Sequence, residues 1–390
     1  MMRGTFNSAL GGCRRAVMSA LGGAALLAGA SVFAPVAQAK EGEPSMSYKV
    51  QTLVEGLHFP WSLAFLPDGG MLVTERTGQL RHITPEGMLV DKPIQGVPPV
   101  FVAGQAGLMD VALDPDFAQN QRIFLTHAYG TSSANNTRLI SARLVDDKLE
   151  DVQTVFSALP AKSGGAHYGG RIAFLPDKSL VLTLGDGFDY RERAQDPSNH
   201  LGSSVRVNRD GSVPPDNPFA GQDGVAAEIF TLGHRNVQAI VYEPRYHKLY
   251  SAEHGPKGGD ELNLLEPGKN YGWPVATHGV DYTGAKVSPH LDLPGLQPAV
   301  LYWTPSIAPS GMTVYWGDVF TAWRGDVFVS ALAERSVRRI AMRDGVPTGE
   351  QEVLFKELDA RIRDVRTGPD GALYLLTDEE KGRVLRVGRE

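Results

Sequence analysis

The feature of this sequence that most constrains its fold is a pattern that recurs six times. Each copy has an alternating apolar segment, a turn that is often Pro-Asp, and a second short apolar segment. The copies span residues 61–83, 108–128, 169–187, 237–255, 311–340 and 362–387. One copy is too short to bury its own faces, so the copies must pack against one another.

The spacing of the copies predicts the architecture. Their turns lie roughly fifty to seventy residues apart, which is enough for a four-stranded antiparallel sheet and its loops. Six such sheets around one axis make an all-β, six-bladed β-propeller, and ring closure leaves only short strand edges exposed. We expect residues 47–54 to supply a strand that closes the ring against the last blade. No composition shift marks a second domain, so residues 40–390 are predicted to form one propeller.

The first 39 residues have the layout of a secretory signal peptide. Three arginines precede an apolar run over residues 16–33, and Ala37-Gln38-Ala39 forms a small-x-small cleavage site before Lys40. A retained membrane anchor is the weaker alternative, because glycines interrupt the run. We therefore predict that residues 1–39 are removed and that the mature chain lies in the periplasm without a membrane span. Arg14-Arg15 leaves open whether export uses the twin-arginine route.

Charge and cysteine content narrow the class of function. Loss of the three arginines, with no acidic residue among the first 39, would change the formal net charge from −6 to −9. A mildly acidic exported protein has little to attract nucleic acid. The only cysteine, Cys13, lies in the predicted signal peptide. The mature chain would therefore have no disulfide, zinc-thiolate site or cysteine nucleophile.

Polar side chains recur just before the first strand of several copies. They are Gln105, His167, Arg235 with Asn236, and Arg361 with Arg363, while the fifth copy offers residues 304–310. Taken singly, each side chain has an ordinary structural explanation: a lone histidine is usually structural, and arginines on a strand are usually solvated. In a propeller, however, these positions meet near the axis at one mouth of the channel. Three guanidinium groups that converge without a carboxylate favour an anion, and a planar polycarboxylate suits their forked geometry. A neutral histidine beside them can act as a general base.

Residues 251–274 carry candidate cation ligands. The Gly255-Pro256 break exposes main-chain carbonyl groups, and Asp260-Glu261 adds carboxylates a few residues later. Calcium binds such carbonyl and carboxylate oxygens together. An ordinary hairpin loop is the alternative interpretation.

Together these motifs resemble the soluble, periplasmic PQQ-dependent aldose sugar dehydrogenases of the glucose/sorbosone dehydrogenase family. The resemblance covers essentially the whole mature chain and is carried by GQAGL, HYGGRIAFLPD, LGHRN, the 251–274 segment through NYGWP, and RIRDV. It implies a six-bladed propeller that binds PQQ and calcium. It also implies oxidation of an aldose to a lactone, with hydride transfer from the anomeric carbon to the quinone.

The resemblance implies roles for individual residues. His167 would take the proton from the anomeric hydroxyl group. The carbonyl groups of Gly255 and Pro256 would bind the catalytic calcium, which polarises the quinone, and Glu261 with the Tyr271 carbonyl would bind a structural one. The residues implied to contact PQQ are Gln105, Arg235, Asn236, Tyr282, Ala331, Leu332, Ala333, Arg361 and Arg363.

The chain departs from the family pattern at two positions. Glucose-specific members have an aspartate immediately before the histidine, where this chain has Ala166. Their cofactor-binding lysine falls at Ala333, with Arg335 near enough to substitute for it. Few polar groups would then specify the sugar, so we expect broad aldose use rather than strict glucose specificity.

Two other functions fit a propeller. A calcium-dependent lactonase or related hydrolase would need several carboxylates and an asparagine around one axial ion, whereas the predicted ring is cationic. A non-catalytic propeller that binds a protein or a sugar would explain the repeats but not the ring. The sequence therefore favours a PQQ-dependent aldose dehydrogenase. Its partners would be an aldose and an external electron acceptor, and it would be a monomer or a homodimer.

Overall fold

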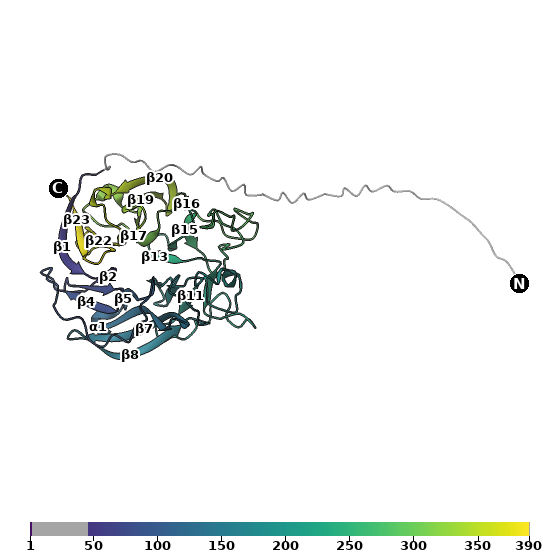
Figure 1. Ribbon diagram of the computed structural model, residues 1–390, viewed down its shortest axis with the longest axis horizontal. Helices are drawn as coiled ribbons and strands as arrows, with labels where there is room; N and C mark the ends of the chain where they lie inside the picture. The colour runs from purple at the N-terminus through teal and green to yellow at the C-terminus, as the bar shows by residue number, and fades with distance from the viewer. Residues whose placement is uncertain (2–45, 390) are drawn as a thin grey trace, which may run out of the picture. The chain divides into compact units, whose positions relative to one another are not determined.

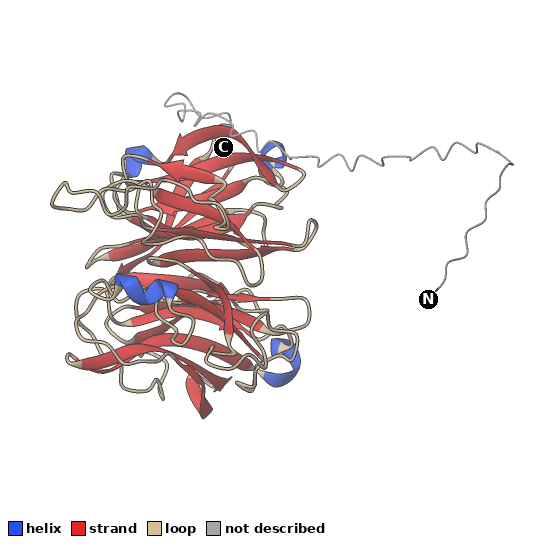
Figure 2. Cartoon of the chain, turned by 90° about the vertical axis from the view of Figure 1, so that its right-hand side faces the viewer, coloured by secondary structure: helices blue, strands red, loops and turns tan. Residues whose placement is uncertain are grey.

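The computed structural model describes Met1 and residues 46–389, so the predicted signal peptide lies, apart from Met1, outside the described residues. Within the described part, six antiparallel sheets surround one axis (Figure 1), and nearly all regular structure is strand (Figure 2). Five sheets have four strands and one has three. The prediction of an all-β, six-bladed propeller is confirmed.

The blades follow the order of the chain. Blade 1 contains β2 (Pro60–Phe65), β3 (Met71–Glu75) and β4 (Gln79–Ile83); blade 2 contains β5 (Leu108–Leu113), β6 (Arg122–Thr131), β7 (Ala134–Val145) and β8 (Lys148–Ser157). Blade 3 contains β9 (Ile172–Phe174), β10 (Leu180–Thr183), β11 (Ser203–Val207) and β12 (Ile229–Leu232); blade 4 contains β13 (Val237–Glu243), β14 (Lys248–Glu253), β15 (Asp260–Leu265) and β16 (Leu301–Trp303). Blade 5 contains β17 (Pro309–Val314), β18 (Val327–Ala331), β19 (Ser336–Arg343) and β20 (Val346–Leu354); blade 6 contains β21 (Ile362–Thr367), β22 (Leu373–Thr377), β23 (Gly382–Gly388) and β1 (Lys49–Leu57). The short helices of the described residues are α1 (Phe117–Asn120), η1 (Arg191–Gln195), η2 (Thr321–Trp323) and η3 (Lys356–Leu358).

The ring is closed by the N-terminal strand, as the sequence predicted. β1 pairs antiparallel with β23, so the last blade takes its outer strand from the start of the chain. The first strands of neighbouring blades contact one another all the way round, from β2 through β5, β9, β13, β17 and β21 back to β2. The ends of these six strands therefore meet around the axis.

The hydrophobic core lies between the blades. Each neighbouring pair of blades shares one cluster of buried apolar side chains. Between blades 6 and 1, for example, Val54 and Leu57 of β1 pack with Leu63 and Val73. The expectation that single copies cannot bury their own faces is confirmed.

Blade 1 differs from the predicted four strands. After β4 the chain carries Pro93, Pro98 and Pro99, which cannot donate to a strand ladder. Only isolated main-chain bonds cover the edge of β4: Val90 N–H donates to His82 (2.9 Å) and Ile94 N–H to Leu80 (2.8 Å).

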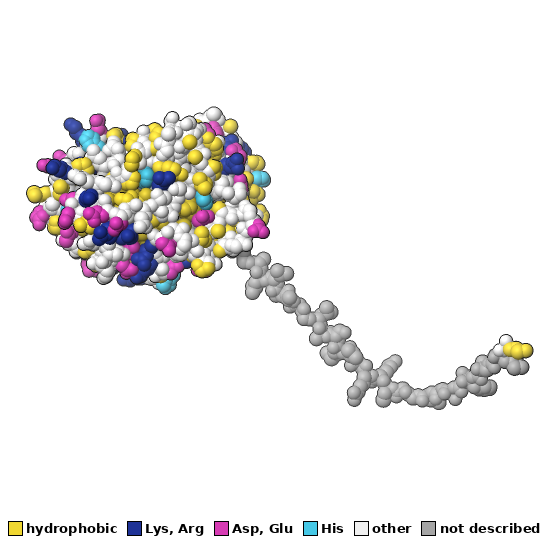
Figure 3. Space-filling view, turned by 90° about the horizontal axis from the view of Figure 1, so that it is seen from below, with side chains coloured by type: hydrophobic (Ala, Val, Ile, Leu, Met, Phe, Trp, Pro, Cys, Tyr) yellow, Lys and Arg dark blue, Asp and Glu magenta, His cyan; other side chains and the backbone are white. Residues whose placement is uncertain are grey.

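Two long segments that lie between copies of the repeat are partly strand. The segment 188–229 contains β11, the third strand of blade 3, and the segment 262–302 continues β15 and reaches β16. The remaining parts of both segments are loops and short turns, and both contribute side chains to the mouth of the site described below. In the described part of the chain, no helix is long and apolar enough to cross a membrane. On the face seen in Figure 3, acidic and basic side chains are intermixed.

Candidate functional site

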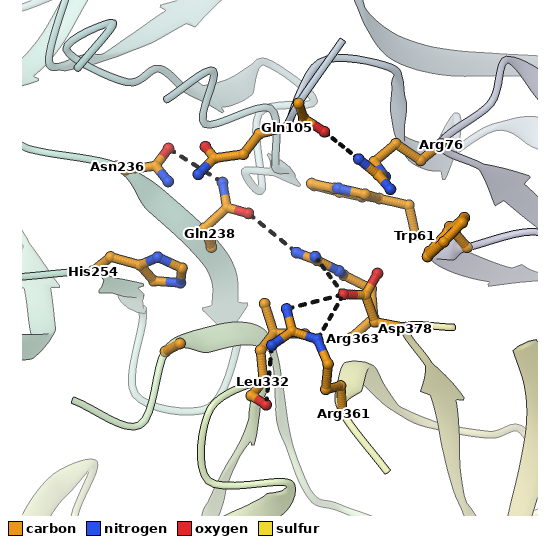
Figure 4. A pocket seen from close by; sticks show the side chains of 13 residues that line it. Trp61, Arg76, Gln105, Asn236, Gln238, His254, Leu332, Arg361, Arg363 and Asp378 are labelled. Atoms are coloured by element: carbon orange, nitrogen blue, oxygen red, sulfur yellow. Dashed lines mark hydrogen bonds and ion pairs between the residues drawn. The ribbon is translucent and has the colours of Figure 1, made fainter. Parts of the chain in front are cut away.

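A cavity of about 450 Å³ lies where the blades meet (Figure 4), within the usual size range of small-molecule sites. Blades 1, 2, 4, 5 and 6 and the loops that lead into them supply its wall. The lining residues are Phe59, Trp61, Arg76, Gly104, Gln105, Asn236, Gln238, His254, Ala308, Leu332, Arg361, Arg363 and Asp378.

The repeat explains why these residues meet. Phe59, Asn236, Ala308 and Arg361 each stand immediately before the first strand of a blade. Trp61, Gln238 and Arg363 are each the second residue of that strand. A third set directly follows the second strand of a blade, and it consists of Arg76, His254, Leu332 and Asp378. Sequence reasoning used the first position. Of the third set the resemblance named only Leu332, and Arg76, His254 and Asp378 were missed, although the same repeat carries both positions.

The floor of the cavity is fixed by Arg171, which is fully buried. Its guanidinium group donates to the carbonyl groups of Gln238 (2.8 Å), Ser310 (2.5 Å) and Arg363 (3.2 Å), and so joins blades 4, 5 and 6. The same group lies 4.0 Å from the ring centre of Trp61. The aromatic side chain and the strand ends below the cavity are therefore held in place by one cation.

The charge of the cavity differs from the prediction in one respect. The arginines do not converge without a carboxylate, because Asp378 accepts from both Arg361 (3.1 Å) and Arg363 (3.2 Å). Burial alone would raise the pKa of Asp378, but the two arginines outweigh burial and lower it. Arg76 supplies a third cation, and burial lowers the pKa of His254 to about 3, so that side chain is neutral.

Three cations against one carboxylate still leave the cavity with an excess of positive charge. The Nε atom of Arg363 is buried and has no hydrogen-bond partner among the described residues. A buried donor without a partner is costly, and an anionic ligand would remove that cost. Asn236 uses its side-chain oxygen for Gly169 N–H (3.1 Å), so its amide group can donate into the cavity.

His167 lies beside this cavity and is only 4% exposed. Its main-chain N–H donates to the side-chain oxygen of Gln105 (2.8 Å), and its backbone has a φ of 53°, in the left-handed region. Gly185 permits this approach, since a Cβ atom there would overlap the His167 carbonyl group. The bond to Gln105 also leaves the amide group of that side chain able to donate to a ligand.

The orienting carboxylate of His167 is Asp186, which sequence reasoning missed. Its Oδ1 atom lies 2.7 Å from Nδ1 of His167 and also accepts from Phe188 N–H (2.8 Å). Its Oδ2 atom accepts from the indole N–H of Trp273 (2.7 Å). An ionised carboxylate only accepts hydrogen bonds, so Nδ1 of His167 carries the proton and Nε2 is the free base. His167 therefore has an orienting acid, Asp186, although the residue before it is Ala166.

The environment keeps His167 neutral. Burial lowers its pKa most strongly, Asp186 opposes this shift, and the positive charges of Arg235 and Lys162 add to it. A neutral imidazole with a fixed tautomer and one free nitrogen is the form that a general base requires.

A second cavity of about 320 Å³ forms the mouth of the site, and Arg235, Pro256 and Tyr282 line it with Phe188. The ring of Phe188 packs edge-on to His167 at 5.1 Å and stacks on Tyr282 at 6.5 Å. Both aromatic side chains are exposed, at 46% for Phe188 and 60% for Tyr282. Arg235 donates to the hydroxyl group of Tyr282 (3.3 Å).

The candidate calcium ligands fall into two places. Gly255 and Pro256 lie on a rim shared with Tyr282, but the Gly255 carbonyl accepts from Arg235 (2.8 Å) in this structure. Glu261 and Tyr271 line none of these cavities. Glu261 is paired by strand register with Glu253, and Asn263 donates to both carboxylates (3.1 and 3.0 Å).

Burial, followed by the charge of Glu253, raises the pKa of Glu261 well above its usual range. Two close carboxylates suit a cation. Among the described residues, however, no group of three or more histidine, aspartate and glutamate side chains that could hold a metal is found.

The fifth blade contributes less than predicted. Of the three candidates there, only Leu332 lines the 450 Å³ cavity, whereas Ala331 is buried in the core between blades 4 and 5 and Ala333 is exposed. Arg335 forms an ion pair with Asp359 (2.6 Å) and does not line the cavity. In this structure its guanidinium group is therefore held by Asp359 and not at the cavity.

Comparison with known proteins identifies the family. A family model described as glucose/sorbosone dehydrogenase matches residues 57–386. The chain belongs to the glucose/sorbosone dehydrogenase family. The resemblance predicted from the motifs is thus confirmed, and so is the expectation of an oxidoreductase.

Several known proteins are similar to this chain over most of their length. Aldose sugar dehydrogenase YliI of Escherichia coli is 43% identical over 344 residues, which cover 87% of this chain and 92% of the relative. Quinoprotein glucose dehydrogenase B of Acinetobacter calcoaceticus is 28% identical, with 86% of each chain covered. The crystal structure of the PQQ-bound aldose sugar dehydrogenase of Streptomyces coelicolor is 28% identical, with a TM-score of 0.72, and the match covers 88% of this chain and 99% of that one.

Proposed function

We propose that this protein oxidises aldoses to lactones with PQQ bound in the 450 Å³ cavity. The observation that carries the proposal is the excess of positive charge in a cavity that adjoins the His167–Asp186 pair. PQQ is a planar tricarboxylate and matches forked arginine donors above an aromatic floor. The naming of PQQ in the structure of the S. coelicolor relative supports the choice of cofactor.

The residues of the cavity divide between binding and chemistry. Arg361 and Arg363 would hold carboxylates of PQQ, and Gln105 and Asn236 would donate to its remaining oxygens. Bound PQQ would supply a two-electron acceptor for the hydride from C1 of the sugar. His167 Nε2 would take the proton from the anomeric hydroxyl group, and Asp186 would stabilise the imidazolium that forms. The electrons would leave to an external acceptor.

Calcium is part of this proposal. The carbonyl groups of Gly255 and Pro256 would hold one ion beside the cofactor, and Arg235 would have to release or share the Gly255 carbonyl when the ion binds. Glu261, with the Tyr271 carbonyl, would hold a second ion that stabilises the fold. Carbonyl and carboxylate oxygens are the ligands that calcium prefers.

The sugar would enter through the mouth between Phe188 and Tyr282. Phe188 packs edge-on against the buried His167 ring, so we expect this side chain to move when a sugar reaches Nε2. Exposed aromatic rings bind the apolar faces of many sugars alike, so we expect comparable use of several mono- and disaccharides. A steep preference for glucose would count against this part of the proposal. The reaction would take place in the periplasm after removal of residues 1–39.

The proposal is tested by titrating purified protein with PQQ in the presence of calcium and following cofactor absorbance and protein fluorescence. We expect one PQQ per chain, with the bound cofactor reduced when an aldose is added. Arg363→Met removes a charged donor and should weaken binding. Loss of a charge-assisted bond of about 1.5–3 kcal/mol corresponds to about ten- to a hundred-fold in Kd. Equal PQQ affinity of the variant and the parent would place the cofactor elsewhere.

A further inference from the structure

Lys162 is a buried cation that the proposed chemistry does not use. It is 1% exposed, and its ammonium group donates one long hydrogen bond to the side-chain oxygen of Asn135 (3.3 Å). The ammonium group also lies 3.8 Å from the ring centre of Tyr168. Taking an ammonium group out of water is costly unless its charge is compensated. The position therefore calls for a reason beyond packing.

The surroundings of Lys162 point to the His167–Asp186 pair. Its side-chain stem packs against Gly187, the residue after Asp186, where an added Cβ atom would lie 2.5 Å from Cδ of the lysine. Tyr190 lies against the same glycine, and its hydroxyl group bonds to Ser163, the neighbour of Lys162. The lysine is thus placed beside the loop that carries the orienting carboxylate.

Asp186 is not bonded directly to the lysine. Its two oxygens already accept from His167, Phe188 and Trp273. Among the ion pairs of the described residues none involves Lys162. Its charge must therefore act on the pair through space, in a buried region where charges are weakly screened.

We propose that Lys162 is a positioning residue that, together with burial and Arg235, helps to hold His167 in its neutral, proton-accepting form. The lysine would do so as a fixed positive charge beside the loop that carries Asp186, opposing a second positive charge on the imidazole. This inference rests on the proposed role of His167 as the base. It adds a specific residue outside the cavity to the proton-transfer machinery.

The signs of the electrostatic effects agree with this role. Burial lowers the pKa of Lys162 to about 8, against the attraction of Asp186 and Asp189, so the side chain is charged below that pH. The groups that face Lys162 are these two carboxylates and the phenols of Tyr168 and Tyr190. Burial raises the pKa of Tyr168, so its phenol stays neutral.

The charged groups that act on His167 include Asp186, Arg235 and Lys162, and the two cations both lower its pKa, Arg235 more than Lys162. His254 also lies close enough for its pKa to be affected by His167, but burial keeps it neutral. Removing the lysine charge should therefore move His167 protonation to higher pH. The base form would then be lost at a pH where the parent still holds it.

The first test uses the cofactor-free protein, in which the histidine NMR signals are followed between about pH 4 and 9. The His167 signal is assigned by its absence in His167→Gln. In Lys162→Met we expect His167 to titrate at higher pH than in the parent, whereas Lys162→Arg, which keeps the charge, should titrate near the parent. Lys148→Met, at an exposed lysine of blade 2, serves as a matched control. If Lys162→Met does not fold, Lys162→Gln takes its place.

The second test measures reduction of the PQQ-loaded protein by a saturating aldose across the same pH range. On the acid limb, the rate of Lys162→Met relative to its own plateau should fall below that of the parent by the factor that the NMR shift sets, which is about ten-fold for a shift of about one pH unit. Unchanged titration of His167 in the charge-removing variant would overturn the inference, as would equal shifts in Lys162→Met and Lys162→Arg. A shift in the NMR titration with no shift in the rate would instead refute His167 as the base and leave the electrostatic coupling standing.

Discussion

Replacement of Asp186 by asparagine tests whether this carboxylate fixes the tautomer of His167 and whether it stabilises the fold. Asp186 accepts three hydrogen bonds, from Nδ1–H of His167, the main-chain N–H of Phe188 and the indole N–H of Trp273. An asparagine has one acceptor oxygen and one donor NH₂ group, so it cannot satisfy all three donors in either orientation.

The two orientations have different consequences. If the asparagine oxygen faces His167 and Phe188, its NH₂ group meets the indole N–H of Trp273. One buried donor is then unpaired, which lowers the free energy of unfolding by about 1–3 kcal/mol. If the NH₂ group faces His167 instead, Nδ1 becomes the acceptor and Nε2 carries the proton. The nitrogen that should accept the sugar proton is then blocked, and a base contribution of about a hundred- to ten-thousand-fold is lost.

The prediction is checked by anaerobic stopped-flow reduction of PQQ-loaded Asp186→Asn with a saturating aldose, together with urea unfolding. We expect the reduction rate to fall by about a hundred-fold or more, with PQQ binding retained. Asp210→Asn, at an exposed turn of the same blade, is the matched control and should behave as the parent. Reduction by Asp186→Asn at the rate of the parent, together with an unchanged free energy of unfolding, would refute the assignment of tautomer and base, because each orientation of the asparagine must lower one of the two quantities.

Four further predictions follow, three from the geometry of the site and one from the sequence. His167→Gln removes the basic nitrogen, so turnover should fall about a hundred- to ten-thousand-fold with PQQ still bound, and near-parental turnover would exclude this base. Arg361→Ala removes a half-exposed partner of Asp378, and its Kd for PQQ should rise about ten-fold or more by fluorescence titration; an unchanged Kd would show that it does not touch the cofactor. Glu261→Gln should remove the stabilisation that comes from the second calcium ion, which for one site amounts to about 2.7 kcal/mol at a concentration 100-fold above Kd, and identical calcium dependence of melting in variant and parent would misplace that ion. Mass spectrometry of periplasmic protein should find the N-terminus at Lys40, whereas an intact Met1 in the cytoplasmic fraction would contradict export.

The repeat accounts for what could be predicted from the sequence. Asn236 and Arg361 could be assigned to the axis because they stand at the start of a first strand, and propeller symmetry places all such positions together. Arg76 and Asp378 follow the second strands and could have been found by the same reasoning applied one strand later. The prediction of a cationic ring without a carboxylate was wrong because the positions that follow the second strands, Asp378 among them, were not considered.

Other contacts depend on loop paths that no spacing specifies. Asp186 reaches His167 because Gly185 allows two loops to approach closely, and Trp273, from a distant segment, fixes the other carboxylate oxygen. Arg335 is near enough in sequence to take the place of the family's lysine, but in the structure it forms an ion pair with Asp359 and does not line the cavity. The partner of a long side chain depends on which residues the fold places beside it, and sequence spacing does not give that.

The central claim is that C1 of an aldose is oxidised at His167 with electrons passing to bound PQQ, and a single-turnover experiment tests it most directly. PQQ-loaded protein is mixed without oxygen with an aldose or its C1-deuterated form, and cofactor absorbance and product are followed together. The account predicts one lactone formed per PQQ reduced, at a rate that falls on deuteration and falls again in His167→Gln. Reduction without lactone, or a product formed with no change in the cofactor, would contradict it.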